Sequence, residues 1–186
     1  MALTRQRFTA DEYLALPLHD HRFTQLIDGE IVVTEASLRH QDIVLLIAYA
    51  LRQWTMARSG RGRAGIPVNV VLDDGNVFAP DVWWVADEHL PASGAMRLDG
   101  PPDLAVEVRS PSTWRYDIGA KKATYERAGL PELWLVDTEA ESVLVYRRSS
   151  SDAATFDVAL ELGSGDLLTS PLLLGFSLSV DEVFAR

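Results

Sequence analysis

The 186-residue sequence contains no cysteine. Disulfide bonds, thiolate zinc sites and cysteine nucleophiles are therefore excluded, and the composition fits a reducing compartment such as the cytoplasm. No apolar run approaches the roughly 18 residues that a membrane-spanning helix needs. Arg5 and Arg7 are not followed by the apolar segment of a secretory signal. We therefore expect a soluble cytoplasmic protein with no membrane partner.

Basic residues are scarce as well, because 17 Lys and Arg stand against 27 Asp and Glu, for a formal net charge of −10. Proteins that bind nucleic acids gain much of their affinity by neutralising phosphates with Lys and Arg. The balance therefore argues against tight non-specific binding of DNA, although a divalent metal ion held by clustered acids adds positive charge locally. Hydrophobic residues make up 47% of the chain, which is typical of a folded protein. The length suits a single domain over 1–186.

Helix and strand signals alternate along the chain. A capping box at Thr9 and Glu12 predicts a short helix, the Asp28-Gly29 turn predicts a hairpin over 23–34, and apolar residues at helical spacing predict a helix over 37–58. The later expected elements are a flexible basic link over 60–65, strands over 66–72 and 77–85, a loop over 89–101, a buried strand over 104–108, a helix over 118–128, a buried strand over 133–136, a hairpin over 143–160 and a short helix from about 179. Strand–helix–strand units combined with hairpins predict an α/β fold, with a mixed sheet flanked by helices.

Two carboxylates stand in strands that are otherwise apolar. Asp81 follows Pro80, which cannot donate a ladder hydrogen bond and is expected at a bulge or a sheet edge. Glu107 lies in the apolar run over 104–108, a strand that we expect to be buried on both faces. A buried carboxylate is costly unless it is paired or bound to a metal ion. Neighbouring strands would bring these two acids into one pocket.

Lys121 would add an ammonium to that pocket. It is four residues from Asp117 and four from Tyr125, so the three share one face of the predicted helix. Hydrolysis of a phosphodiester needs an activated water and a stabilised negative phosphate. A Mg²⁺ ion held by one or two carboxylates lowers the pKa of a bound water, and a neighbouring lysine can stabilise the transition state. The pattern therefore favours hydrolysis of a phosphate ester.

The most distinctive stretch of the sequence is PDLAVEVRSPS over 102–112. It is followed by Asp117, Lys121, Tyr125 and GLPELWLVD over 129–137, and it is preceded by LIDGE over 26–30, His40 and Pro80-Asp81. These residues resemble a large bacterial family of restriction endonucleases, formerly a domain of unknown function, within the PD-(D/E)XK nuclease superfamily. The resemblance runs from about Phe8 to Phe184 and implies a restriction-endonuclease-like fold.

The resemblance also implies a function, a metal-dependent DNA endonuclease that hydrolyses phosphodiester bonds. The implied catalytic residues are Asp81, Glu107 and Lys121, with Asp81 and Glu107 as ligands of Mg²⁺ or Mn²⁺ and Lys121 moved from the strand to the helix. The candidates for substrate binding are Arg109, His40 and Tyr125. Many endonucleases of this architecture cut DNA as dimers, and apolar strand edges would permit a homodimer.

Two positions depart from the expected pattern. Arg109 stands where the superfamily usually has a strand lysine, and because it stays protonated it suits phosphate binding better than proton transfer. Gln25 stands where the family commonly has an acid. The alternative hypothesis is therefore a catalytically inactive module that binds nucleic acid or protein on a nuclease scaffold, and a hydrolase of another phosphate ester is a third.

Three of these site residues also have a purely structural interpretation. Glu107 could form a buried salt bridge with Lys121, Asp81 could cap a turn after its proline, and His40 could help to cap the long helix.

Overall fold

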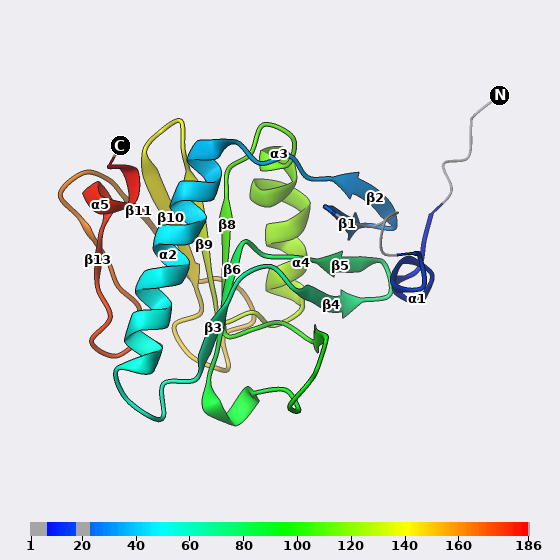
Figure 1. Ribbon diagram of the computed structural model, residues 1–186, viewed down its shortest axis with the longest axis horizontal. Helices are drawn as coiled ribbons and strands as arrows, with labels where there is room; N and C mark the ends of the chain where they lie inside the picture. The colour runs from blue at the N-terminus through cyan, green and yellow to red at the C-terminus, as the bar shows by residue number, and fades with distance from the viewer. Residues whose placement is uncertain (1–6, 18–22, 186) are drawn as a thin grey trace.

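A computed structural model describes residues 7–17 and 23–185. Its elements, in chain order, are α1 (Ala10–Leu14), β1 (Thr24–Ile27), β2 (Glu30–Val33), α2 (Leu38–Met56), β3 (Arg63–Gly65), β4 (Asn69–Asp73), β5 (Asn76–Phe78), β6 (Val82–Val85), the 3₁₀ turn η1 (Asp87–His89), β7 (Arg97–Asp99), β8 (Leu104–Val108), α3 (Trp114–Tyr116), the π-helical turn η2 (Asp117–Lys121), α4 (Lys122–Arg127), β9 (Glu132–Asp137), β10 (Ser142–Arg147), β11 (Val158–Leu162), β12 (Leu167–Leu168), β13 (Leu178–Ser179) and α5 (Val180–Phe184) (Figure 1).

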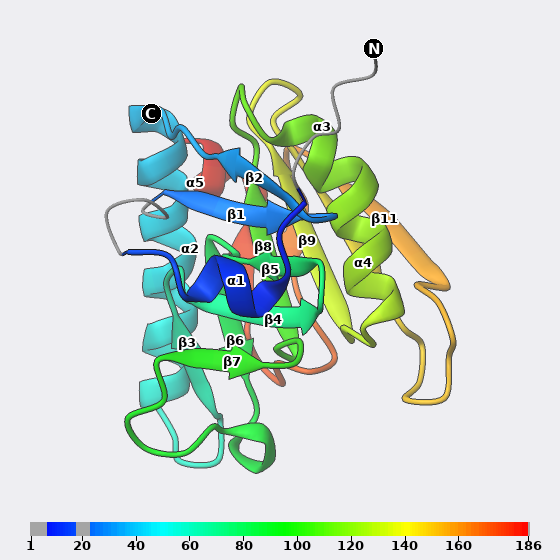
Figure 2. The same cartoon turned by 90° about the vertical axis from the view of Figure 1, so that its right-hand side faces the viewer.

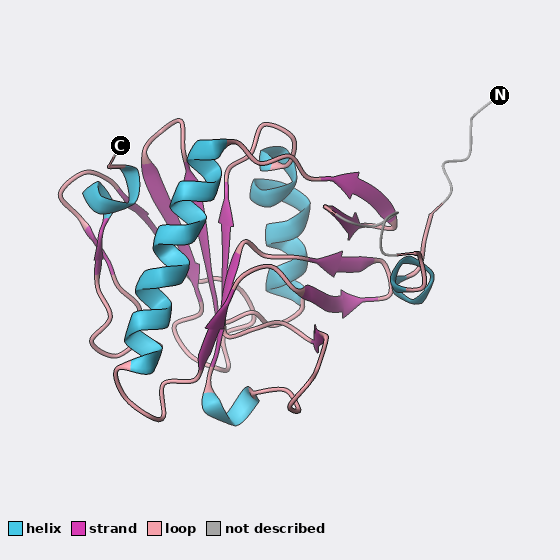
Figure 3. Ribbon diagram, viewed as in Figure 1, coloured by secondary structure: helices cyan, strands magenta, loops and turns pink. Residues whose placement is uncertain are grey.

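The larger of two main sheets has the strand order β11-β10-β9-β8-β6-β3. It is mixed, because β8 and β9 run parallel while its other neighbouring strands are antiparallel. Helix α2 covers one face, and α3, η2 and α4 cover the other (Figure 3). The expected α/β fold with a mixed sheet flanked by helices is confirmed.

The smaller sheet has the strand order β2-β1-β5-β4-β7 and carries α1 against it. In Figure 2 its strands cross in front of those of the larger sheet. Leu26 and Val77, both fully buried, form a core here with Tyr13 of α1. The chain passes from the smaller sheet to the larger one between β5 and β6, through Ala79, Pro80 and Asp81.

Local signals in the sequence predicted several elements correctly. The hydroxyl of Thr9 accepts from the backbone of Glu12, and the Glu12 carboxylate accepts from the backbone of Thr9, so the capping box is present. Asp28 and Gly29 have φ angles of 49° and 76°, the left-handed conformation that a two-residue hairpin turn requires. Gly129, with φ of 88°, ends the helix that precedes β9.

Three predictions about strands were wrong. Residues 77–85 do not form one strand, because Pro80 lacks the N–H that would continue a ladder and the chain changes sheets there. The predicted flexible link contains β3, which pairs with β6. The predicted loop over 89–101 contains β7, which runs parallel to β4. In the described part of the chain, none of the helices has the length and apolar character needed to span a bilayer.

Candidate functional site

A cleft of about 750 Å³ is lined by both sheets and by the first turn of α2. Asp81, Glu107 and His40 all line it, together with Gln25 of β1. The structure therefore brings together three residues that the sequence analysis selected. None of the described residues that line the cleft is Lys or Arg.

Glu107 reaches this cleft because of its place in β8. Leu104, Val106 and Val108 belong to the core on the α2 side of the sheet, so the alternation of strand side chains turns Glu107 toward α4. Its Oε2 lies 2.6 Å from the Nζ of Lys121, and its side chain is only 3% exposed. The chain thus places a carboxylate and an ammonium in contact inside the protein.

Lys121 contacts a second carboxylate, since its Nζ lies 3.0 Å from Asp117 Oδ1. Both residues belong to η2, a π-helical turn between α3 and α4, and π-helical turns occur frequently at functional sites. Asp117 Oδ2 accepts a hydrogen bond from the hydroxyl of Thr113, and that hydroxyl lies 2.8 Å from the one of Ser110. The ammonium is therefore fixed between two buried acids.

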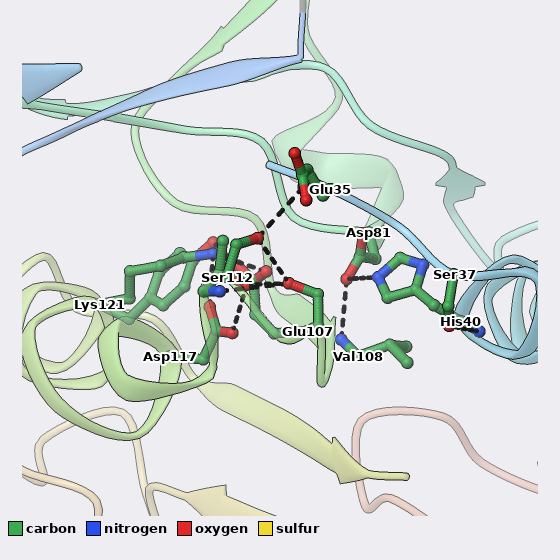
Figure 4. A network of polar contacts seen from close by, with 12 residues as sticks. Glu35, Ser37, His40, Asp81, Glu107, Val108, Ser112, Asp117 and Lys121 are labelled. Carbon is green, nitrogen blue, oxygen red and sulfur yellow. Dashed lines mark hydrogen bonds and ion pairs between the residues drawn. The ribbon is translucent and has the colours of Figure 1, made fainter. Parts of the chain in front are cut away.

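Asp81 is held from two sides. Its Oδ2 accepts a hydrogen bond of 2.8 Å from the backbone of Val108 and lies 3.2 Å from His40 Nε2. Ser37 caps α2 with its hydroxyl, so the predicted alternative of a capping side chain for His40 does not apply. In Figure 4, Glu107 lies between the Lys121–Asp117 pair on one side and the Asp81–His40 pair on the other.

Burial sets the protonation of this cluster. It raises the pKa of Glu107 to about 8, Lys121 opposes the shift, and the charges of Asp117 and Asp81 add to it. Burial would lower the pKa of Lys121, but Asp117 and Glu107 outweigh this effect and raise the pKa above its ordinary value. Burial therefore favours the protonated form of Glu107 in the metal-free cluster, and the two neighbouring carboxylates favour the charged form of Lys121.

Tyr125 and Arg109 have contacts that differ from those expected of substrate-binding residues. Tyr125 is fully buried and donates a hydrogen bond of 2.8 Å to Glu107 Oε1, so it positions Glu107 and is not accessible to a substrate. Arg109 Nη1 donates to both carboxylate oxygens of Asp137, and its Nη2 lies 2.7 Å from Glu139 Oε2. Its guanidinium also lies over the ring of Trp114 and does not line the cleft.

Gln25, the residue that stands in place of an expected acid, is buried in the wall of the cleft. Its side-chain oxygen accepts a hydrogen bond of 3.1 Å from the backbone of Ala79. This hydrogen bond therefore links β1 to the segment that carries Asp81.

Comparisons with known proteins identify the family of the chain. A family model named Uma2 and described as "Putative restriction endonuclease" matches residues 10–181. The chain belongs to the Uma2 family. The resemblance to restriction endonucleases is thereby confirmed. A search of curated proteins found no significant match.

One similar solved structure is that of "a putative nuclease belonging to DUF820" from Anabaena variabilis ATCC 29413. It superposes on this Uma2 chain with a TM-score of 0.80, at 20% identity, over 95% of this chain and 97% of that chain. The likeness shows that the two proteins share a fold. Family and fold together support a nuclease.

Asp81 and Glu107 have the chemistry that a divalent metal ion needs in this Uma2 site. Carboxylate oxygens suit Mg²⁺ and Mn²⁺, and among the described residues nothing hydrogen-bonds to Asp81 Oδ1. The structure shows no group of three or more His, Asp or Glu arranged around a metal position within 7–17 and 23–185. The chain would thus offer two carboxylates, a set that Mg²⁺ commonly completes with water and substrate phosphate.

Two residues of this site were missing from the candidates drawn from the sequence. Asp117 had a signal in its four-residue spacing to Lys121, the residue with which it forms an ion pair. Thr113 has the same four-residue spacing to Asp117, but it precedes the helix predicted over 118–128, so the spacing alone did not predict a helical contact.

Proposed function

We propose that this chain is a Mg²⁺-dependent endonuclease that hydrolyses phosphodiester bonds in DNA, with Asp81 and Glu107 holding the ion and Mn²⁺ able to replace it. One observation carries the proposal: carboxylates from two different segments line one cleft, and a buried ammonium lies 2.6 Å behind one of them. Membership of the Uma2 family supports the same conclusion.

The protein's own residues orient these two carboxylates. Lys121 holds Glu107 Oε2 and Tyr125 holds Oε1, while the backbone of Val108 holds Asp81 Oδ2. When bound there, a divalent ion would lower the pKa of an attacking water and offset the charge of the phosphate.

Lys121 acts through Glu107 in this proposal. Its side chain is 1% exposed and is not part of the cleft wall, so it reaches substrate only by way of that carboxylate. Its positive charge stabilises the ionised form of Glu107, which is the form that binds a metal ion. This positioning role differs from the catalytic role that the family resemblance implies for Lys121.

DNA binding should depend on the metal ion. The described cleft wall has no Lys or Arg, and the chain carries a net charge of −10. A phosphate therefore meets positive charge in the cleft only when a cation is bound. His40 remains a candidate for substrate contact, because it lines the cleft beside Asp81. Arg109 could bind phosphate only by exchanging its two acidic partners.

The same cleft wall favours a second candidate function, a non-catalytic module that binds protein or nucleic acid. Of these two partners the wall suits a basic protein surface, because an acidic surface without a metal ion would repel DNA. The two functions differ in one property, since only the endonuclease requires a divalent ion.

The single domain over 1–186 and the cytoplasmic location stay predictions.

A cleavage assay tests the proposal. Supercoiled plasmid and a labelled single strand are incubated with the wild type in Mg²⁺, in Mn²⁺ and in EDTA, beside Asp81→Asn and Glu107→Gln. Glu132→Gln is the matched control, because Glu132 is a buried acid of the neighbouring strand β9 that bonds to Trp134 and Ser170 away from the cleft.

We expect metal-dependent cutting by the wild type and the control, and none by the two cleft variants. A folded wild type that cuts neither substrate, or cutting that survives Glu107→Gln, would contradict the proposal. A folded wild type that cuts neither substrate and binds no divalent metal ion would favour the non-catalytic module.

A further inference from the structure

Helix α2 is apolar on two opposite faces. One face packs into the core through Ile43, Ile47 and Leu51. The opposite face exposes four large apolar side chains: Leu38 at 86%, Leu45 at 68%, Tyr49 at 58% and Met56 at 71%. We call these four residues the outer stripe. A surface helix normally presents polar residues to solvent, so the outer stripe calls for another explanation.

The outer stripe is continuous along the helix. Its members follow one another at intervals of seven, four and seven residues, which places them within about 40° around the axis at 100° per residue. This is the spacing of the seam by which two helices pack in a coiled coil. In Figure 2, α2 lies on one side of the larger sheet, with α3 and α4 on the other. The exposed fractions of the four side chains show that the outer stripe is accessible.

We propose that the outer stripe is the interface with a second copy of this chain, in which the two α2 helices pack antiparallel about a two-fold axis. The order of residues supports a second copy as the occupant, because it is symmetric about the middle of the helix. In the antiparallel pair Leu38 of one copy lies opposite Met56 of the other, and Leu45 lies opposite Tyr49. A two-fold interface requires such self-complementarity.

Charges beside the outer stripe support the same arrangement. Asp42 and Arg52 are exposed and flank the stripe, and the antiparallel register places Asp42 of each copy opposite Arg52 of the other. A parallel pair would instead place Asp42 against Asp42 and Arg52 against Arg52, which is unfavourable. The two-fold arrangement therefore satisfies two opposite-charge pairs together with the apolar seam. It does not depend on the proposed nuclease activity.

Sedimentation velocity of the full chain tests the interface. We expect the wild type to be a dimer at micromolar concentration and Leu45→Glu to weaken association by about tenfold or more, because a charge at the seam would be buried without a partner. The matched control is Leu160→Glu, which changes an exposed leucine on the edge strand β11 and should leave the dimer intact. A monomeric wild type would overturn the proposal, and so would a dimer that Leu45→Glu leaves intact.

A charge exchange tests the register. Asp42→Arg should weaken the dimer by placing Arg against Arg52, and the double variant with Arg52→Asp should restore it. Both residues are exposed, so folding is expected to be unaffected, and circular dichroism verifies this. Failure of the double variant to restore association would contradict the antiparallel register.

The absence of cysteine allows a cross-linking test of the same register. A mixture of Leu38→Cys and Met56→Cys chains should form a disulfide-linked dimer, whereas Leu38→Cys alone should not. Cross-linking of Leu38→Cys alone, or a mixture that forms no disulfide between a Leu38→Cys chain and a Met56→Cys chain, would overturn the antiparallel arrangement.

Discussion

Replacing Glu107 by glutamine should make the metal-free protein more stable at alkaline pH. The Glu107 side chain is 3% exposed, and burial raises its pKa from 4.5 to about 8. Glutamine has nearly the same shape and carries no charge. Its oxygen can accept from Lys121 while its amide donates to the Tyr125 hydroxyl, so the two contacts of the carboxyl group are retained.

The magnitude follows from proton binding. Between pH 4.5 and about 8 the folded protein keeps a proton on Glu107 that the unfolded chain has lost. Stability from this group is therefore fully present below pH 4.5 and decreases as the pH rises through about 8. One proton corresponds to about 1.4 kcal/mol per pH unit, so the full decrease has an upper limit of roughly 5 kcal/mol. The Glu107→Gln variant has no such proton to lose, so its free energy of unfolding lacks this contribution to the pH dependence.

Urea unfolding in EDTA, at a series of pH values between about 5 and 9, measures the free energy of unfolding directly. Wild type should lose stability across this range more steeply than Glu107→Gln. The control Glu88→Gln removes an exposed carboxylate from η1 and should keep the wild-type slope. Parallel curves for wild type and Glu107→Gln would contradict this prediction, because they would mean that Glu107 ionises alike in the folded and unfolded states.

Three further substitutions test the cluster around Glu107. Lys121→Met should destabilise the protein by about 3–5 kcal/mol in urea unfolding, because it removes the cation from a buried ion pair. The control Lys122→Met should have a much smaller effect, and equal effects of the two substitutions would contradict the pairing. Tyr125→Phe should cost about 1–3 kcal/mol above pH 8, since an oxygen of ionised Glu107 loses its donor, and an unchanged stability would argue against that bond. Gln25→Glu should tighten Mg²⁺ binding in calorimetry by placing a third carboxylate in the cleft wall, and weaker binding would contradict the placement.

Local rules predicted those parts of the fold that depend on a few adjacent residues. The capping box at Thr9, the turn at Asp28-Gly29 and the helix end at Gly129 each require only short-range geometry. The strands β3 and β7 have no comparable local signal. Each has three residues and exists because a distant strand, β6 or β4, pairs with it. Long-range pairing of this kind is not expressed in the sequence of the short strand itself.

The same distinction between local and long-range signals applies to the candidate site. An acid inside an apolar strand is conspicuous in a sequence, so Asp81 and Glu107 could be selected, and Lys121 followed from its helical spacing. The contacts of Arg109 with Asp137 and Glu139 could not be predicted, because they arise where β8 ends beside the end of β9. The burial of Tyr125 likewise depends on how α4 packs against Phe78.

Calorimetric titration with Mn²⁺ above pH 8, where Glu107 is ionised, tests most directly whether Asp81 and Glu107 together hold one divalent metal ion. We expect one ion per chain for the wild type, unchanged binding for Glu132→Gln and no binding for Glu107→Gln. Wild-type protein that binds no ion at millimolar Mn²⁺, or a Glu107→Gln variant that binds like the wild type, would contradict this assignment.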